Sequence, residues 1–370
     1  MAEKNNVTIL IAPLDWGLGH ATRCVPVIHY LHQQGCKVVI ATEGMQEKLL
    51  KAEFPFLEFV RLPGYGIKYT SRKRFFSLKI ITQLPKILLA VNKEKKWLNN
   101  YLKDNQYAAI ISDNRYGLYS STVRSVFITH QLFIKAPFSL IEKIIQRLNY
   151  RMINRFSECW VPDYASGKSL AGILSHPAAL PKVPVHYLGG LSRLSAESEQ
   201  VKKFDLLIII SGPEPQRTIL EKQLFAELEH FEGTVLFIRG LPGKESFLPD
   251  LPKVTVRSHL SAKELSEAFN TGEVIISRSG YTTVMDICKL KKKSILIPTP
   301  GQTEQEYLAI HLQKQGWCVA ATQQNFSLPE LLQKVATFNW CLPDMNMDFY
   351  KEKLDVFVDQ LTAPVFRKDT

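Results

Sequence analysis

The sequence predicts an α/β protein built from two doubly wound parallel sheets. Short apolar runs rich in Val and Ile alternate with longer helical patterns along the whole chain. Runs that are apolar on both faces and separated by helices are typical of parallel strands covered by helices on both sides. The length of 370 residues fits two domains, at roughly 100 to 200 residues each.

The predicted strands fall into two groups. In the first half they are Val7–Ala12, Lys37–Thr42, Leu57–Leu62, Ala108–Ser112, Ser125–Thr129 and Cys159–Val161. In the second half they are Leu206–Ser211, Gly233–Arg239, Val254–Ser258, Val274–Ser277, Ser294–Pro298 and Cys318–Ala320. A helical pattern follows most of these runs, as a doubly wound sheet requires.

A segment of small and polar residues separates the two groups of strands. Gly189 and Gly190 precede the stretch LSRLSAESEQVKK, and such a composition is typical of a linker. We therefore predict a first domain over residues 1–190, a linker over 191–204 and a second domain over 205–346. The last helical pattern, residues 347–361, follows Pro343 and is expected to pack back on the first domain.

The composition excludes several classes of protein. The hydrophobic fraction of 45% and the charged fraction of 22% are typical of a folded soluble chain. No stretch approaches the ~20 apolar residues of a membrane span. The first apolar segment, residues 7–13, is too short for a signal-peptide core. We expect a cytoplasmic protein. The six cysteines form no C-x-x-C pair and are interpreted as buried thiols.

The net charge of +11 is concentrated in the first half. Residues 72–103 hold nine Lys and Arg against one acid, Glu94, with Phe, Leu and Ile interleaved. This pattern predicts a helix that lies on an anionic membrane surface or surrounds an acidic ligand. A helix with a buried apolar face and a solvated basic face explains the same pattern.

A glycine-rich turn follows the first predicted strand and precedes a helix. Gly17 and Gly19 lie in this turn, where the backbone can approach a ligand and the helix directs free N–H groups toward it. His20 comes next, at the sheet edge where such folds bind ligands. An imidazole there can take a proton from an acceptor hydroxyl. Capping of the helix is the alternative role.

Polar residues also follow two other strands of the first half. Asp113 comes directly after a strand and is expected to orient His20 or to hold the acceptor. His130 and Gln131 follow the next strand and lie at the same edge of the predicted sheet. Turn and cap roles are common for these residue types and remain an alternative.

Three loops of the second half connect a strand to a helix and are rich in hydroxyl, amide and acidic groups. They are residues 211–217, 277–283 and 298–306, and Asp286 lies about one turn into the helix after the second loop. Free amides at a helix N-terminus and an Arg side chain suit a diphosphate, and acids suit a ribose. Helix caps and capping boxes explain each loop taken alone.

These motifs resemble the GT-B glycosyltransferases of family 28. The resemblance is carried by G-L-G-H near the N-terminus and by S-R-S-G-Y-T-T-V-M-D and P-T-P-G-Q-T-E-Q-E-Y-L-A in the second half. The motifs are similar to those of the family of N-acetylglucosaminyltransferases that form lipid II. The resemblance implies two Rossmann-like domains that face a deep cleft. The second domain would bind a nucleotide-diphosphate sugar, commonly UDP-linked, and the first would bind the acceptor.

The resemblance also implies site residues. Asp286 lies where the family has a Glu that holds the ribose, and Gln305 matches the family's donor-binding Gln. The predicted donor-binding residues are Ser211, Gly212, Arg217, His259, Arg278, Ser279, Gly280, Thr282, Asp286, Gln302, Gln305 and Glu306. The predicted acceptor-binding residues are Gly17, Gly19, His130 and Gln131. The Ser-Gly-Pro-Glu-Pro loop differs from the family's Gly-Gly-Ser, and Thr129-His130-Gln131 resembles its His-Glu-Gln only loosely.

The predicted reaction is an inverting hexosyl transfer to a hydroxyl, with His20 and Asp113 as catalytic residues. Helix N-termini at Gly212 and at Ser279–Gly280 would stabilise the leaving diphosphate. No D-x-D pair occurs in the sequence, so we expect no metal ion, and no cofactor besides the donor. The acceptor is expected to be lipid-linked or a cell-envelope glycan, with the enzyme peripheral at the inner face of the membrane.

Two other functions compete with this one. A nucleotide-sugar 2-epimerase shares the fold but needs several carboxylates around the sugar, and the loops of the first half supply few. A non-enzymatic basic protein that binds lipid or nucleic acid is the second. RNA binding requires exposed aromatic residues on a sheet or a known motif, and the sequence displays neither, so we expect no nucleic-acid partner.

Overall fold

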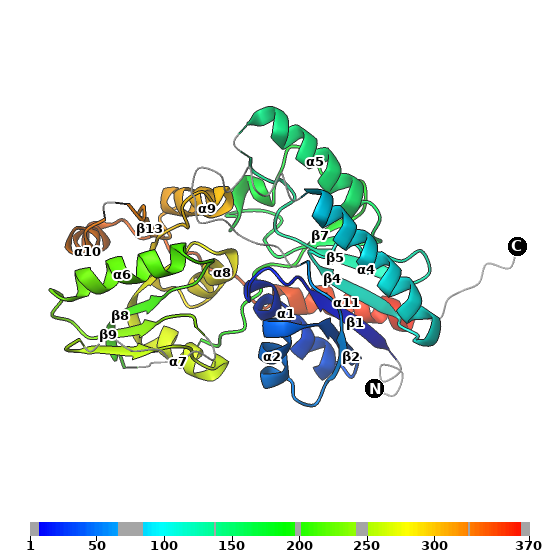
Figure 1. The fold of residues 1–370 in the computed structure, drawn as a ribbon, viewed down its shortest axis with the longest axis horizontal. Helices are drawn as coiled ribbons and strands as arrows, with labels where there is room; N and C mark the ends of the chain where they lie inside the picture. Colours follow the sequence, from blue (N-terminus) through cyan, green and yellow to red (C-terminus); the bar gives the residue numbers. More distant parts are fainter. Residues whose placement is uncertain are drawn as a thin grey trace, which may run out of the picture.

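The computed structural model describes residues 7–65, 84–136, 138–196, 201–241, 251–324 and 326–363. Within them the chain forms two parallel β-sheets, one from each half of the sequence, with helices packed around both (Figure 1). The fold therefore has the two doubly wound sheets that the alternation of apolar runs and helical patterns predicted.

The first sheet has the strand order β3-β2-β1-β4-β5-β6-β7, with all neighbours parallel. Its strands are β1 (Thr8–Pro13), β2 (Lys37–Thr42), β3 (Glu58–Arg61), β4 (Ala109–Asp113), β5 (Arg124–Ile128), β6 (Glu158–Val161) and β7 (Val185–Tyr187). The helices of this half are α1 (Gly19–Gln33), α2 (Gly44–Glu53), α4 (Leu84–Asp104) and α5 (Ser139–Ile153), with the short 3-10 helix η3 (Gly172–Leu174).

The second sheet has the order β10-β9-β8-β11-β12-β13, and its neighbours are also parallel. Its strands are β8 (Phe204–Ile209), β9 (Val235–Ile238), β10 (Val254–Arg257), β11 (Gly272–Ser277), β12 (Lys293–Leu296) and β13 (Val319–Ala320). Its helices are α6 (Gln216–Leu228), α7 (Ala262–Thr271), α8 (Tyr281–Lys289), α9 (Thr303–Lys314) and α10 (Leu328–Thr337).

Every predicted strand overlaps an observed one, and β7 is the strand that the sequence did not predict. This strand spans only Val185–Tyr187 and lies at the edge of the sheet, with His186 exposed. Because an edge strand is covered on fewer sides, it needs no long apolar run. The central strands β1, β4 and β11 are recognisable because nearly all of their residues are buried.

Burial on both faces is clear in β1. Ile9 and Ile11 belong to one core cluster, which also contains Val27 and Ile28 of α1. Leu10 and Ala12 point to the other face, where they join a cluster that contains Leu98 of α4. A strand covered by helices on both sides must be apolar at every position, which explains its unbroken hydrophobic run.

Helix α11 (Phe349–Thr362) follows the second half in sequence but packs on the first, where it contacts α1 (Figure 1). The Tyr30 hydroxyl donates to Asp355 over 2.9 Å, and the Phe357 ring meets Trp160 edge-on with centroids 4.8 Å apart. Residues of both halves belong to one continuous core cluster. The end of the chain thus helps to hold the two halves together.

Two further expectations concern side chains and membrane spans. Five of the six cysteines are buried, but Cys341 is exposed because it lies in an irregular segment after α10, so that prediction was wrong for this residue. Among the described helices, none has the length and apolar character to cross a membrane.

The strand order reverses once in each sheet, between β1 and β4 in the first and between β8 and β11 in the second. At such a point the loops after the two central strands diverge to opposite faces and leave a crevice at the carboxyl edge, where open α/β sheets bind ligands. The loops after β1 and β4, and those after β8 and β11, are therefore the places to look for a site.

Candidate active site

The turn after β1 places His20 at the carboxyl edge of the first sheet. Gly17 has a φ of +75°, a left-handed conformation that glycine adopts without strain, and its carbonyl accepts a hydrogen bond of 3.0 Å from the Gln46 amide. Helix α1 begins two residues later, after Leu18, whose side chain has no acceptor. The first-turn amides are thus left for solvent or a ligand.

His20 forms a hydrogen bond with a fully buried carboxylate. Its Nδ1 lies 2.7 Å from Oδ1 of Asp113, the last residue of β4, and β4 pairs Asp113 with Pro13 of β1. Burial by itself would raise the pKa of Asp113, but the adjacent Arg23 and His20 hold this pKa well below its ordinary value. The carboxylate is therefore ionised and acts only as an acceptor.

His20 is neutral at physiological pH. Burial and the nearby Arg23 lower its pKa below the ordinary value of 6.5, and Asp113 offsets part of this decrease. In the tautomer with its hydrogen on Nδ1, the ring donates to Asp113 and Nε2 keeps its lone pair. The predicted pair of His20 and Asp113 is thus brought together with the protonation state of a general base.

Arg23 lies three residues after His20 on α1 and was missed by the sequence analysis. It is 2% exposed, and it donates to both carboxylate oxygens of Asp113. Its Nη1 lies 3.0 Å from Nδ1 of His130, which follows β5. The spacing of one helical turn from His20 is the signal that could have identified it.

The predicted acceptor residues His130 and Gln131 contact a carboxylate of the second half. Oε1 of Glu304, in the first turn of α9, lies 2.7 Å from Nε2 of His130, and the Gln131 amide donates to Oε2. The His130 ring also stacks on Tyr281, at the start of α8, with centroids 4.0 Å apart. Glu304 and Tyr281 lie inside the recognised motifs, but nothing in those motifs indicates that they contact the other half.

Helices α1 and α8 also meet directly. The hydroxyl of Thr282 donates to the carbonyl of Gly19 over 3.1 Å, and a Cβ atom on Gly19 would lie only 3.0 Å from that hydroxyl oxygen. Gly19 therefore permits the close approach of the two helix N-termini. The predicted roles of Gly17 and Gly19 in acceptor binding and of Thr282 in donor binding remain predictions.

In the second sheet, the loop after β8 lies beside the loop after β12. Gly212 has a φ of +109°, and the Thr299 hydroxyl oxygen lies 3.5 Å from the position of a Cβ on Gly212. This hydroxyl is buried and has no hydrogen-bond partner in the described part of the chain. A buried donor without a partner, next to an open glycine loop that includes Ser211, suits an anionic ligand.

Arg278 follows β11 and is 1% exposed. It donates to backbone carbonyls of Pro298 and Gln216 over 3.1 and 2.8 Å, and burial lowers its pKa to about 10. No carboxylate pairs with it among residues 7–65, 84–136, 138–196, 201–241, 251–324 and 326–363. A buried cation without a counter-ion favours an anion at this edge.

The predicted donor residues of α8 and α9 shape these loops. The Ser279 hydroxyl donates to the carbonyl of Gln305, whose side chain accepts from Thr299 N over 2.8 Å. Glu306 accepts from Gly301 N over 2.9 Å. Gln302 precedes α9 and Gly280 precedes α8 as N-cap residues. These groups hold the loops in place, and their contacts with a donor stay predictions.

Asp286 and Arg217, two other predicted donor residues, have protein partners. Asp286 accepts from the Ser192 hydroxyl of the linker over 2.5 Å, and burial raises the pKa of this carboxyl to about 6. Arg217 is paired with Glu214 and Glu221 at 2.6 and 3.3 Å, so its charge is already balanced. His259 lies after β10, and burial lowers its pKa.

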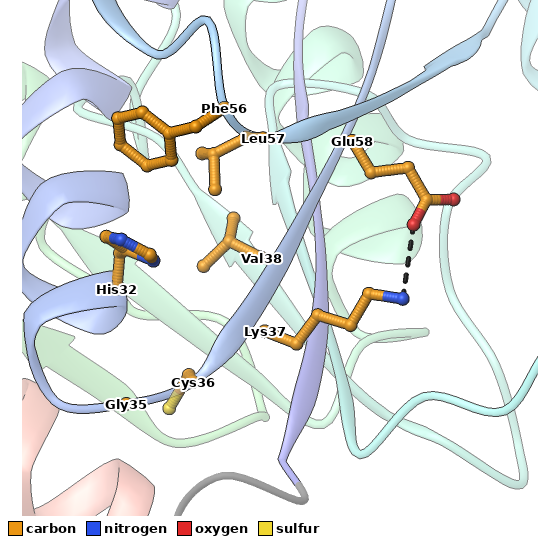
Figure 2. A pocket seen from close by; sticks show the side chains of 8 residues that line it. All are labelled: His32, Gly35, Cys36, Lys37, Val38, Phe56, Leu57 and Glu58. Carbon is orange, nitrogen blue, oxygen red and sulfur yellow. Dashed lines mark ion pairs between the residues drawn. The ribbon is translucent and has the colours of Figure 1, made fainter.

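A hollow of about 500 Å³ lies at the opposite, amino edge of the first sheet, where β2 and β3 begin (Figure 2). The His32 ring faces Phe56 across it, and Lys37 pairs with Glu58 at 3.2 Å. The loops that carry the residues above lie at the other edge of the sheet. We therefore place the candidate site at the carboxyl edges.

In the ranges that the structure describes, no group of three or more His, Cys, Asp or Glu side chains lies close enough together to hold a metal ion.

Comparisons with known sequences agree with the resemblance. Residues 216–347 match the family model described as the glycosyltransferase family 28 C-terminal domain. The chain is 23% identical over 321 residues to the UDP-N-acetylglucosamine–N-acetylmuramyl-(pentapeptide) pyrophosphoryl-undecaprenol N-acetylglucosamine transferase of Listeria welshimeri, with 82% of each chain covered. It is 28% identical over 333 residues to the transferase of the same name from Haemophilus ducreyi, with 85% of each covered.

Solved structures show the same fold. MurG of Acinetobacter baumannii matches with a TM-score of 0.52 and 16% identity, covering 96% of this chain and 95% of that one. The spinosyn rhamnosyltransferase SpnG matches with a TM-score of 0.64 and 14% identity, covering 96% of both. The fold is GT-B, and the chain is a glycosyltransferase similar to family 28.

The ionisation state of His20 can be measured directly. In an NMR titration of the ligand-free protein, the His20 imidazole should titrate below pH 6.5, because burial and Arg23 disfavour its charged form. Asp113→Asn should lower the midpoint further, since the carboxylate favours the imidazolium. Exposed His29 on the same helix is the internal control. A His20 midpoint above 6.5, or one raised by Asp113→Asn, would contradict this assignment.

Proposed function

We propose that the protein transfers a hexosyl group, with inversion, from a UDP-linked sugar to a hydroxyl of a lipid-linked acceptor. We also propose that it needs neither a metal ion nor a cofactor besides the donor. The observation that carries the proposal is the neutral imidazole of His20, held by Asp113 beside the loops of the second half. The named relatives take UDP-N-acetylglucosamine and a pyrophosphoryl-undecaprenol acceptor, which supports both substrates.

The chemistry requires removal of one proton. The acceptor hydroxyl attacks the anomeric carbon, and its proton passes to Nε2 of His20 as the new bond forms. Attack occurs on the face opposite the departing diphosphate, so a single displacement inverts the anomeric configuration. Asp113 stabilises the imidazolium that results, because it is ionised and hydrogen-bonded to Nδ1.

The leaving diphosphate needs positive electrostatic potential. Arg278 supplies a buried positive charge next to the loop of Pro298, and the N-terminus of α8 begins at Gly280 with no side-chain cap. Thr299 adds a buried hydroxyl beside Gly212. Fixed donors and charges of this kind stabilise developing negative charge without reorganisation.

His20→Ala should lower turnover about 10²-fold or more, with the affinity for UDP little changed, because the base acts on the acceptor and not on the nucleotide. Turnover is measured as release of nucleoside diphosphate in a screen of UDP-, GDP- and dTDP-sugars with lipid-linked acceptors. His29→Ala, an exposed change on the same helix, is the control. Unaltered turnover of His20→Ala would assign His20 to helix capping.

Asp286→Ala should weaken UDP binding by roughly 1.5–3 kcal/mol, the contribution of charged hydrogen bonds to the ribose. Calorimetry with UDP measures the change. Ser192→Ala is the matched control, because Ser192 is the linker residue that bonds to Asp286 in the ligand-free protein. Equal affinity of Asp286→Ala and the wild type would remove the ribose assignment, and an equal loss in Ser192→Ala would assign the effect to the linker.

An enzyme with a lipid-linked acceptor must bind a membrane surface, and the first half has features that suit such binding. Of the basic stretch 72–103, residues 72–83 lie outside the described residues, while α4 presents Leu88 and Leu89 to solvent beside exposed Lys93. We propose that this region and helix α5 bind anionic lipid.

Helix α5 carries an exposed apolar stripe within a basic face. Leu140, Ile144 and Leu148 recur every four residues and are 70%, 52% and 40% exposed. Lys143, Arg147 and Arg151 recur with the same spacing beside them and are also exposed. A helix face with exposed leucines among basic residues suits an interface of acyl chains and anionic headgroups.

Glu142, the one acid of α5, is directed elsewhere. Its carboxylate accepts from the backbone N–H of Ala136 over 3.1 Å, at the start of the helix. The exposed face therefore carries positive charge alone, and each basic residue near the headgroups can contribute ~1 kcal/mol. This charge favours an anionic membrane over a neutral one.

The protein should co-sediment with phosphatidylglycerol vesicles and be released by salt, because the attraction is screened over ~10 Å at 0.1 M ionic strength. Replacing Leu140 and Ile144 with Ser, Lys143 and Arg147 with Glu, or Arg72, Lys73 and Arg74 with Glu should weaken this binding and leave UDP affinity unchanged. Ile310→Ser, an exposed apolar residue of α9, is the control. Equal binding to neutral vesicles, or no loss in these variants, would favour a soluble acceptor.

A further inference from the structure

We propose that Arg23 is a positioning residue of the transfer reaction. From its buried position on α1 it determines which ring nitrogens of His20 and His130 donate and which accept hydrogen bonds. The inference rests on the proposed role of His20 as the base. Arg23 is not part of the glycine-rich motif. At 2% exposure it is too deeply buried to contact a substrate directly.

Arg23 contacts Asp113, His20 and His130. Its Nε and Nη2 donate to the two oxygens of Asp113 as a fork, and its Nη1 lies 3.0 Å from Nδ1 of His130. Nη2 also lies 2.8 Å from Nδ1 of His20. A guanidinium has five N–H donors and no acceptor, and its planar geometry matches a carboxylate in two-point contact.

This geometry selects one tautomer of His20. Nδ1 lies near both a pure donor, Arg23, and a pure acceptor, Asp113. With hydrogen on Nδ1, the ring makes a charge-assisted bond to the carboxylate, whereas in the other tautomer the Nδ1 lone pair faces Arg23 and Oδ1 together. The hydrogen is assigned to Nδ1, because Arg23 already donates to both oxygens of Asp113 and thereby holds Oδ1 at 2.7 Å from Nδ1. Only this form leaves Nε2 free to accept a proton.

The tautomer of His130 is selected as well. Arg23 donates to its Nδ1, so Nδ1 is the acceptor and Nε2 donates to Glu304. One guanidinium thus links the carboxylate under the base to the carboxylate that arrives from the second half. Arg23 sets the donor and acceptor pattern on both imidazoles at this edge.

The charge of Arg23 also acts on the titration of His20. The groups that face His20 are Arg23 on its own helix, Asp113 on β4, His130 after β5 and Glu304 on α9. A cation in contact with an imidazole disfavours a second positive charge, whereas Asp113 favours it. Removing the arginine charge leaves Asp113 unbalanced, so His20 should hold its proton at higher pH. A base is active when deprotonated, so the acid limb of the rate profile should move to higher pH.

The test compares Arg23→Gln and Arg23→Lys with the wild type. In an NMR titration of the ligand-free protein, Arg23→Gln should raise the His20 midpoint by roughly 1 unit or more, and Arg23→Lys should leave it near the wild-type value. With a UDP-sugar and acceptor, the acid limb of kcat/KM should move in parallel. Both variants should lower kcat, because neither Gln nor Lys can donate to both oxygens of Asp113 in the two-point geometry of the guanidinium. Lys differs from Gln in that it keeps the positive charge.

A purely structural arginine gives a different result. A purely structural role predicts less folded protein, with an unchanged His20 midpoint in the fraction that stays folded. The double variant Arg23→Gln with Asp113→Asn removes both buried charges, and it is measured beside the single variant. Its His20 midpoint should lie below that of Arg23→Gln. Arg61→Gln, an exposed arginine at the end of β3, is the control. A midpoint in Arg23→Gln at or below the wild-type value, or no difference from the double variant, would overturn the proposal.

The two proposals fail separately. Full turnover in His20→Ala would remove the base role while leaving the titration result intact. An unmoved midpoint in Arg23→Gln, together with loss of turnover in His20→Ala, would remove the role of Arg23 and leave the base in place.

Discussion

The buried carboxylate of Asp113 is the constraint on which the site depends. A carboxylate at 0% exposure is destabilising by several kcal/mol unless its charge is balanced and its oxygens are hydrogen-bonded. Arg23 and His20 meet that requirement, and both come from the first turns of α1. The strand pairing that sets Asp113 beside Pro13 therefore also fixes where α1 must start. Fold stability and the position of His20 share one set of contacts.

The second half completes this cluster without supplying a base. Glu304 and Tyr281 reach His130, and Thr282 reaches Gly19, all from helix N-termini at the carboxyl edge of the second sheet. These contacts lie beside an apolar one, because Tyr281 and Leu308 belong to the same core cluster as Leu174 and Leu188 of the first half. The structure thus connects its halves both through buried apolar side chains and through polar contacts at the site.

The sequence was most informative where local rules decide the outcome. Strands buried on both faces show as apolar runs, and parallel neighbours end at one edge, which predicted that His20, Asp113 and His130 would lie together. Arg23 and Glu304 were missed because their partners lie 90 and 174 residues away in sequence. The same limit applies to Asp286, whose partner Ser192 lies 94 residues away. The partners of Arg217 lie only three and four residues away, and the sequence analysis did not consider them.

The two arginines of the second half show why the partner decides the role. Both are buried, but Arg217 lies between Glu214 and Glu221, so a phosphate there would approach a site whose net charge is not positive. Arg278 binds only carbonyl oxygens in the described structure, and burial lowers its pKa to about 10, which leaves it charged at neutral pH. Its charge is balanced only when an anion lies nearby. Binding of a diphosphate would thus relieve an electrostatic cost already present in the folded protein, which makes Arg278 the better-placed of the two for the donor.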